Sequence, residues 1–157
     1  MRKAVISASA FAVVAPLLLV GTVSQANAAP ALSTCFASSC TGHPAASYTC
    51  VNDAEVIYSL NIMHGSTVVG NIQLKYSPSC RATWARVISN LSNGSTGVIQ
   101  SSQTSPILEE DCFGTGGPGT GCNTNMIDDL SPLTSRAVGA INLNVAGDAV
   151  SNQTPFF

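Results

Sequence analysis

The fold is decided by residues 55–76, which read EVIYSLNIMHGSTVVGNIQLKY. Apolar side chains recur at every second position before a central break, at Val56, Tyr58, Leu60 and Ile62. After the break the same alternation runs through Val68, Gly70, Ile72, Leu74 and Tyr76. A period of two is typical of a half-buried strand. The break, His64-Gly65-Ser66, has the composition of a tight turn. The segment therefore predicts an antiparallel β-hairpin.

Further short strands are expected on the C-terminal side of this hairpin. The candidates are residues 80–88, 97–101, 125–129, 136–145 and 149–153. For residues 80–88 a short helix beginning at Pro78 is the alternative, although a strand is favoured. Turn signals separate the candidates, and no helical period of useful length occurs after residue 28. The fold class predicted is mainly β, a small disulfide-stapled antiparallel β-barrel or sandwich.

Two segments show neither a strand period nor a helix period. Residues 29–54 are rich in small and polar side chains and are expected to be an extended segment pinned by disulfides. Residues 103–122 combine an acidic cluster with five glycines and Pro118, which indicates a flexible, glycine-rich insertion clipped by a disulfide.

The N-terminus has the pattern of a signal peptide over residues 1–28. Arg2 and Lys3 precede a long apolar run, residues 4–20, and Ala26-Asn27-Ala28 is a small-x-small cleavage site. A retained membrane anchor is the alternative, since the run approaches the length needed to span a bilayer. The cleavage site and the polar residues before it favour removal. We therefore expect a secreted, extracellular protein with one β domain, residues 29–157, that is not an integral membrane protein after cleavage.

The charge of the expected mature chain argues against nucleic-acid binding. The full chain has six Lys and Arg against eight Asp and Glu, a net charge of −2. Loss of Arg2 and Lys3 changes the net charge to −4 and leaves four cations, Lys75, Arg81, Arg86 and Arg136. A nucleic-acid-binding domain normally has a basic surface, so no nucleic-acid partner is expected.

All six cysteines follow the predicted cleavage site, and an even number in an exported chain indicates three disulfides. Cys112 and Cys122 flank the glycine-rich stretch and are expected to pair with each other. The other four pair either as Cys35–Cys40 with Cys50–Cys80 or as Cys35–Cys50 with Cys40–Cys80. The chain has no Cys-x-x-Cys and only two histidines, so zinc is poorly supported. No metal or cofactor is expected.

Several of these residues also carry a resemblance to a known family. The spacing of Cys35, Cys40 and Cys50, the Thr41-Gly42-His43-Pro44 step, and above all residues 75–86, KYSPSCRATWAR, resemble the domain-of-unknown-function family numbered 2690. The Tyr-Ser-x-x-Cys-x-x-x-Trp-Ala core is its most specific part, and the resemblance extends over roughly residues 35–140. It implies a secreted or extracytoplasmic bacterial protein, but no activity that transfers to this chain.

The chain departs from the family pattern in two places. Family members commonly have Gly-x-Asp-Pro where this chain has Gly42-His43-Pro44, so one residue and its carboxylate are missing. The segment between Cys112 and Cys122 also differs from the usual pattern. In some family architectures a similar domain forms the outer part of a membrane protein with a cytoplasmic DNA-binding module, which implies ligand or envelope sensing.

The candidate binding residues are Trp84, Arg86 and Asp128. Trp84 is interpreted mainly as a core side chain, because a single Trp beside a disulfide usually packs inside, with stacking on a sugar as the alternative. Asp128 is the candidate acid that matches the family pattern. No catalytic residue is assigned, since the chain lacks Gly-x-Ser-x-Gly and no free thiol is expected.

The favoured function is therefore a non-enzymatic interaction domain at the cell envelope or outside the cell. Its partner would be an envelope or extracellular protein, or a glycan. One alternative is an extracellular hydrolase in which Asp128 forms an acidic pair with Glu109, Glu110 or Asp111. The other alternative is a protease inhibitor that presents the loop of residues 112–122.

Overall fold

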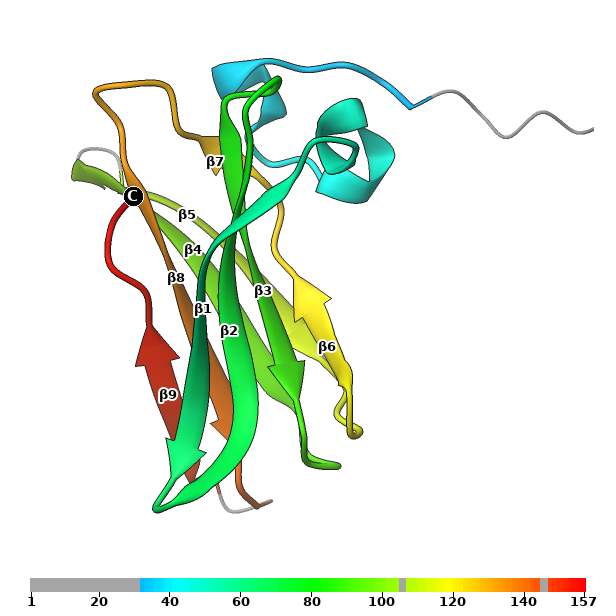
Figure 1. Cartoon of the computed structure of the whole chain (residues 1–157), viewed down its shortest axis with the longest axis vertical. Coiled ribbons are helices and arrows are strands. Elements are labelled where there is room, and N and C mark those ends of the chain that lie inside the picture. The colour runs from blue at the N-terminus through cyan, green and yellow to red at the C-terminus, as the bar shows by residue number, and fades with distance from the viewer. Residues whose placement is uncertain (1–31, 105–106, 145–146) are drawn as a thin grey trace, which may run out of the picture. The chain divides into compact units, whose positions relative to one another are not determined.

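The computed structural model describes residues 32–104, 107–144 and 147–157 (Figure 1). The predicted signal peptide, residues 1–28, lies outside this part of the chain. The elements are the 3-10 turns η1 (Ala37–Cys40), η2 (Ala45–Ser47) and η3 (Thr49–Val51), followed by the strands β1 (Glu55–His64), β2 (Thr67–Ser77), β3 (Ala82–Ser89), β4 (Ser95–Thr104), β5 (Ile107–Gly114), β6 (Thr120–Asn123), β7 (Ile127–Asp128), β8 (Ser135–Asn142) and β9 (Ala149–Gln153).

These strands form two antiparallel sheets. The first has the order β1-β2-β3-β6, with β7 also paired to β3, and the second has the order β5-β4-β8-β9. Figure 1 shows the first sheet in front of the second. The mainly β prediction is confirmed. Of its two alternatives the sandwich describes the structure, because the ladders of the described strands do not close into a barrel.

The predicted hairpin is confirmed as β1 and β2. His64 pairs with Thr67, which leaves Gly65 and Ser66 as a two-residue turn. Gly65 has φ +59°, as the first central residue of a type II′ turn requires, so the hairpin depends on this glycine. The strand favoured for residues 80–88 is confirmed as β3, which begins at Ala82 after a turn and pairs with β2 along its whole length.

The main core lies between the two sheets. Its largest fully buried members include Ile62, Ile72, Leu74, Val87, Ile99 and Ile141. Two glycines let the sheets approach closely. A Cβ on Gly70 would lie 2.7 Å from Cγ1 of Ile141, and a Cβ on Gly139 would lie 2.9 Å from Cβ of Ile72. Each isoleucine thus occupies the space left by the glycine on the facing sheet.

The glycine-rich segment differs from the loop expected for residues 103–122. It contains β5, at the edge of the second sheet, and β6, at the edge of the first. The Cys112–Cys122 disulfide is present and joins these two strands, so it links the two sheets covalently. Position 121 requires glycine, because a Cβ there would overlap the carbonyl oxygen of Val87 on β3. What looked like flexibility in the sequence is partly close packing of backbones.

The N-terminal segment, residues 32–54, is called the cap here. The sequence predicted an extended segment without helix, but the cap contains η1, η2 and η3. It packs against β3 and β7, where it buries a second apolar cluster. The prediction that disulfides pin this segment is correct, as the next section describes. Among the described residues, no helix is long and apolar enough to cross a membrane.

Candidate functional site

The disulfides hold the cap on the sheet. Cys35 bonds to Cys40 within the cap, and Cys50 bonds to Cys80 in the turn between β2 and β3. Of the two pairings that the sequence left open, the structure has this one. All six cysteines are in disulfides, so the four sulfur atoms gathered under the cap carry no thiolate that could bind a metal.

Trp84 lies under the cap. Its side chain is 2 % exposed, and it packs in the second apolar cluster with Cys40, Cys50, Cys80 and Met126. The interpretation of Trp84 as a core side chain therefore agrees with its burial. This core lies on the outer face of β3, whereas Ala85 and Val87 face the main core between the sheets. The cap thus makes part of β3 buried on both faces.

A pocket of about 140 Å³ opens where the cap meets the sheet. The cap contributes Pro44, Ala45, Ala46 and Val51, and the sheet side contributes Lys75, Trp84, Asn123 and Thr124. The Nζ atom of Lys75 lies 5.4 Å from the centroid of the Trp84 ring. The pocket therefore combines an apolar wall, one ammonium group and one side-chain amide.

Lys75 lines this pocket, and a second cation, Arg86, lies on the same face of the sheet. Lys75 pairs with Trp84 across the β2–β3 ladder, and Arg86 follows Trp84 by two positions, so all three point to the outer face. Burial, and then the charge of Arg86, hold the pKa of Lys75 below its usual value. No carboxylate of the described residues is recorded within ion-pair distance of either cation. Within the described part of the chain, the charges of Lys75 and Arg86 are therefore not neutralised by an ion pair.

Asp128 is not brought to this pocket. It lies on β7, where it pairs with Ala82, and its backbone N–H donates to Oγ1 of Thr41 over 3.1 Å. Its carboxylate accepts a hydrogen bond from the backbone N–H of Leu130 over 2.8 Å. These contacts are those of a residue that orders a turn, and a binding role for Asp128 stays a prediction.

The acidic cluster forms a separate feature on β4 and β5. Glu109, Glu110 and Asp111 line a shallow depression of about 370 Å³ together with Val98. Glu110 accepts a hydrogen bond from the side-chain amide of Asn125 over 3.1 Å. Asp128 does not line the depression, and the hydrolase hypothesis stays a prediction.

The loop between Cys112 and Cys122 is tied to the rest of the sandwich. The N–H of Gly117 donates to the carbonyl of Leu91, and the N–H of Gly119 donates to that of Ser89. An inhibitory loop must be presented for insertion into a protease cleft, whereas these bonds hold the glycine-rich part against the β3–β4 connection. The inhibitor hypothesis gains no support from this geometry.

Sequence reasoning identified Trp84 and Arg86 but not the cation beside them. Lys75 entered the predictions only as one of four cations, and the pocket wall from Pro44 to Val51 was not anticipated. The register of β2 on β3 brings Lys75 opposite Trp84. The alternation of side chains along the two strands could have identified this neighbourhood. Once the strands pair, residues 73, 75, 84 and 86 lie on the same face.

Comparisons with known proteins place the chain in a family without assigning an activity. Residues 38–138 match the family described as "Protein of unknown function (DUF2690)". The "Uncharacterized protein YjfA" of Bacillus subtilis (strain 168) is 31 % identical over 108 residues, which cover 61 % of this chain and 69 % of that protein. No solved structure gives a significant match. The resemblance noted in the sequence is thus confirmed, and the chain belongs to the DUF2690 family.

Proposed function

We propose that this protein is a non-enzymatic, extracytoplasmic binding domain that holds a carboxylate-bearing terminal group of an envelope glycan or peptide in the Lys75–Trp84 pocket. One observation carries the proposal: Lys75 lines a partly apolar pocket, Arg86 lies on the same face of the sheet, and neither cation has a carboxylate partner among the described residues. An anion would relieve the repulsion between the two cations and compensate the partial burial of Lys75.

The size of the pocket supports a ligand bound by its end. Pockets that enclose a whole small molecule usually measure about 300–1,000 Å³, and this one measures about 140 Å³. It has room for one small group, such as a methyl beside a carboxylate. Pro44, Ala46 and Val51 offer an apolar wall for the methyl, and the side-chain amide of Asn123 offers a donor and an acceptor.

The compartment is part of the proposal. Three disulfides are typical of proteins that fold in an oxidising environment, and the N-terminal pattern of residues 1–28 supports export. A carboxylate-bearing polymer or peptide outside the cytoplasm is then the ligand class that this chemistry favours.

The proposal is tested by titrating the protein with N-acetylalanine and monitoring its NMR spectrum. Trp84 is the only tryptophan, so its indole N–H signal reports on the pocket without assignment of the spectrum. A ligand of this size is expected to bind with a Kd of about 1–10 mM. N-acetylalanine amide, which lacks the negative charge, serves as the matched control and should bind at least about tenfold more weakly.

Two variants complete the test. Lys75→Met keeps the length of the side chain without its charge and should weaken binding about tenfold or more. Arg136→Gln removes a cation from the other sheet, where Arg136 stacks on Phe156, and should leave binding unchanged. An indole signal that stays in place with the acid, or that moves equally with the acid and the amide, would contradict the proposal.

A further inference from the structure

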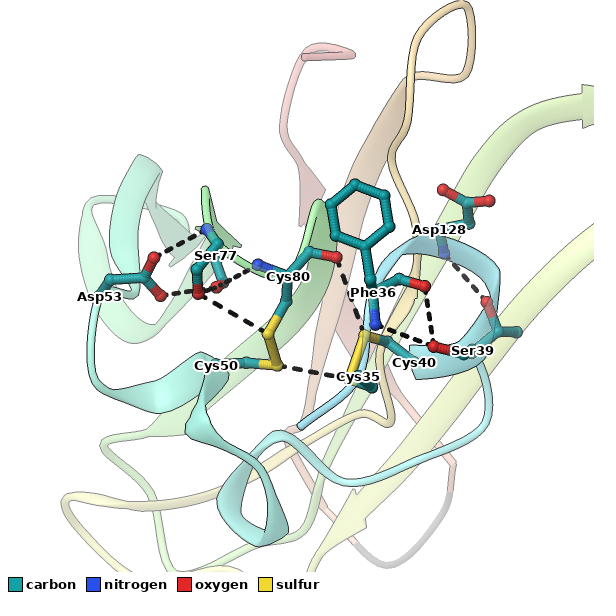
Figure 2. The surroundings of a disulfide bond; sticks show 11 residues. Cys35, Phe36, Ser39, Cys40, Cys50, Asp53, Ser77, Cys80 and Asp128 are labelled. Carbon is teal, nitrogen blue, oxygen red and sulfur yellow. Dashed lines mark hydrogen bonds between the residues drawn. A yellow bond between two sulfur atoms is a disulfide. The ribbon is translucent and has the colours of Figure 1, made fainter. Parts of the chain in front are cut away.

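The two disulfides under the cap are in contact with each other. Sγ of Cys35 lies 3.5 Å from Sγ of Cys50, so the Cys35–Cys40 bond touches the Cys50–Cys80 bond. All four sulfur atoms lie within 4.8 Å of one another. Figure 2 shows the two bonds side by side, with a dashed line between Cys35 and Cys50. A thiolate on either bridge would therefore have a disulfide within reach.

Access to the four sulfur atoms is unequal. Cys35 is partly exposed, whereas Cys40 and Cys50 are fully buried and Cys80 is 1 % exposed. A thiol in solution meets the Cys35–Cys40 bridge first. The Cys50–Cys80 bridge is shielded from solvent. The partly exposed residue whose sulfur atom contacts this bridge is Cys35.

We propose that this four-cysteine cluster is a thiol–disulfide exchange site that passes two electrons from an external dithiol to the buried bridge. In the first step the dithiol is oxidised to its disulfide and Cys35–Cys40 is reduced to two thiols. In the second step the Cys35 thiolate attacks Sγ of Cys50. The Cys35–Cys50 bond forms, the Cys50–Cys80 bond breaks, and Cys80 leaves as a thiolate that takes up the proton lost by Cys35. The product has one disulfide, Cys35–Cys50, and two thiols, Cys40 and Cys80.

The leaving sulfur has a hydrogen-bond donor in place. The hydroxyl of Ser79 lies 3.9 Å from Sγ of Cys80 and donates to it. The hydroxyl of Ser77 donates to Asp53 over 2.6 Å and accepts from Ser79 over 3.3 Å. The Ser79 proton is therefore shared between the Ser77 oxygen and the Cys80 sulfur and can shift to the sulfur as the thiolate develops. A donor at this position stabilises the thiolate that develops as the Cys50–Cys80 bond breaks.

The exchange also moves a covalent link. Cys50–Cys80 is the bridge that joins the cap to the sheet, whereas Cys35–Cys50 lies wholly within the cap. After exchange, non-covalent contacts alone would hold the cap over Trp84. Fluorescence of this single tryptophan should therefore rise as the disulfide beside it is lost and the cap loosens.

Partial reduction of the wild-type protein tests the exchange. The oxidised protein is treated anaerobically with one equivalent of dithiothreitol, sampled over time, alkylated, and digested with trypsin and chymotrypsin. Cleavage after Phe36, Tyr48, Tyr76 and Arg81 places the four cysteines on four different peptides. Among molecules that have lost Cys35–Cys40, we expect a Cys35–Cys50 cross-link with alkyl groups on Cys40 and Cys80. If Cys50–Cys80 persists in these molecules at every time point, the proposal is overturned.

A variant tests the second step without a reductant. Cys40→Ser leaves Cys35 as a lone thiol beside the buried bridge, and we expect the free thiol to be divided between Cys35 and Cys80. Cys122→Ser is the matched control, because Cys112 lies outside the cluster and should remain its single free thiol. A thiol found only on Cys35 would overturn the proposal. If the variant does not fold, the partial reduction of the wild-type protein is the deciding experiment.

A second variant separates exchange from simple reduction. Ser79→Ala should slow the appearance of the Cys35–Cys50 cross-link severalfold, up to about tenfold. It should leave the rate at which Cys35–Cys40 is reduced unchanged. Equal slowing of both steps would show that Ser79 acts on the fold rather than on the leaving thiolate.

Discussion

Asp129 is a carboxylate held in an unfavourable place, and its titration should be visible in the stability of the protein. Its side chain is 7 % exposed, and its Oδ1 atom has no hydrogen-bond partner in the described part of the chain. Burial raises its pKa from 3.8 to about 6, although the nearby Ser135 hydroxyl and the Arg81 charge act in the opposite direction. The folded protein therefore binds a proton at Asp129 more tightly than the unfolded chain does.

The sign and size of the effect follow from this shift. Stabilisation by the protonated form is fully present below pH 3.8, the unfolded value, and is lost as the pH rises through about 6. A shift of about two units corresponds to about 3 kcal/mol of unfolding free energy. The contribution of Asp129 should thus fall by up to about this amount between pH 4 and pH 7.

Urea unfolding of the oxidised protein, followed by the fluorescence of Trp84, measures this contribution. Asp129→Asn cannot ionise, so its stability relative to the wild type should rise by about 2–3 kcal/mol between pH 4 and pH 7.5. Asp111→Asn, a change at an exposed carboxylate, is the control and should follow the wild type. If the curves of wild type and Asp129→Asn run parallel over this range, the burial argument is wrong.

Two further changes test how the cap and the sheets are held together. Asp53→Ala removes the acceptor of hydrogen bonds from the Ser77 hydroxyl and the Ser79 N–H; it should cost about 1 kcal/mol at pH 7 in urea unfolding. That cost should shrink below pH 3.8, because the same bonds, the one from Ser77 first, hold the pKa of Asp53 below its usual value and their contribution is lost on protonation. Gly139→Ala places a methyl 2.9 Å from Cβ of Ile72 and should cost about 1–3 kcal/mol; an unchanged urea midpoint would show that the sheets can separate to accept it.

The sequence was sufficient where local chemistry decides the structure. The β1–β2 hairpin follows from a period of two and from one glycine in a two-residue turn. The Cys112–Cys122 bridge follows from the separation of these cysteines from the other four. The remaining pairing stayed open for a physical reason that the structure makes visible. All four sulfur atoms lie within 4.8 Å of one another, so the fold gathers the four cysteines in one place, and their spacing along the chain does not decide which of them pair.

The sequence was insufficient where tertiary contacts decide. The acidic cluster and the five glycines of residues 103–122 predict a flexible insertion, whereas residues 107–114 form β5. At Gly114 and Gly121, however, the glycines allow two backbones to meet, since a Cβ on Gly114 would lie 3.3 Å from Cα of Gly121. Close approach of this kind depends on which strands become neighbours, and composition alone does not specify it.

The cap explains why the pocket lies where it does. On the outer face of β3, Trp84 is buried, whereas Arg86, two residues further along the same face, is exposed. The cap therefore ends between these side chains, and the pocket is the step at its edge. Lys75, opposite Trp84, is half covered by the same edge. Because the Cys50–Cys80 bridge fixes that edge to the sheet, any change that loosens the cap should alter both the stability of the second core and the shape of the pocket.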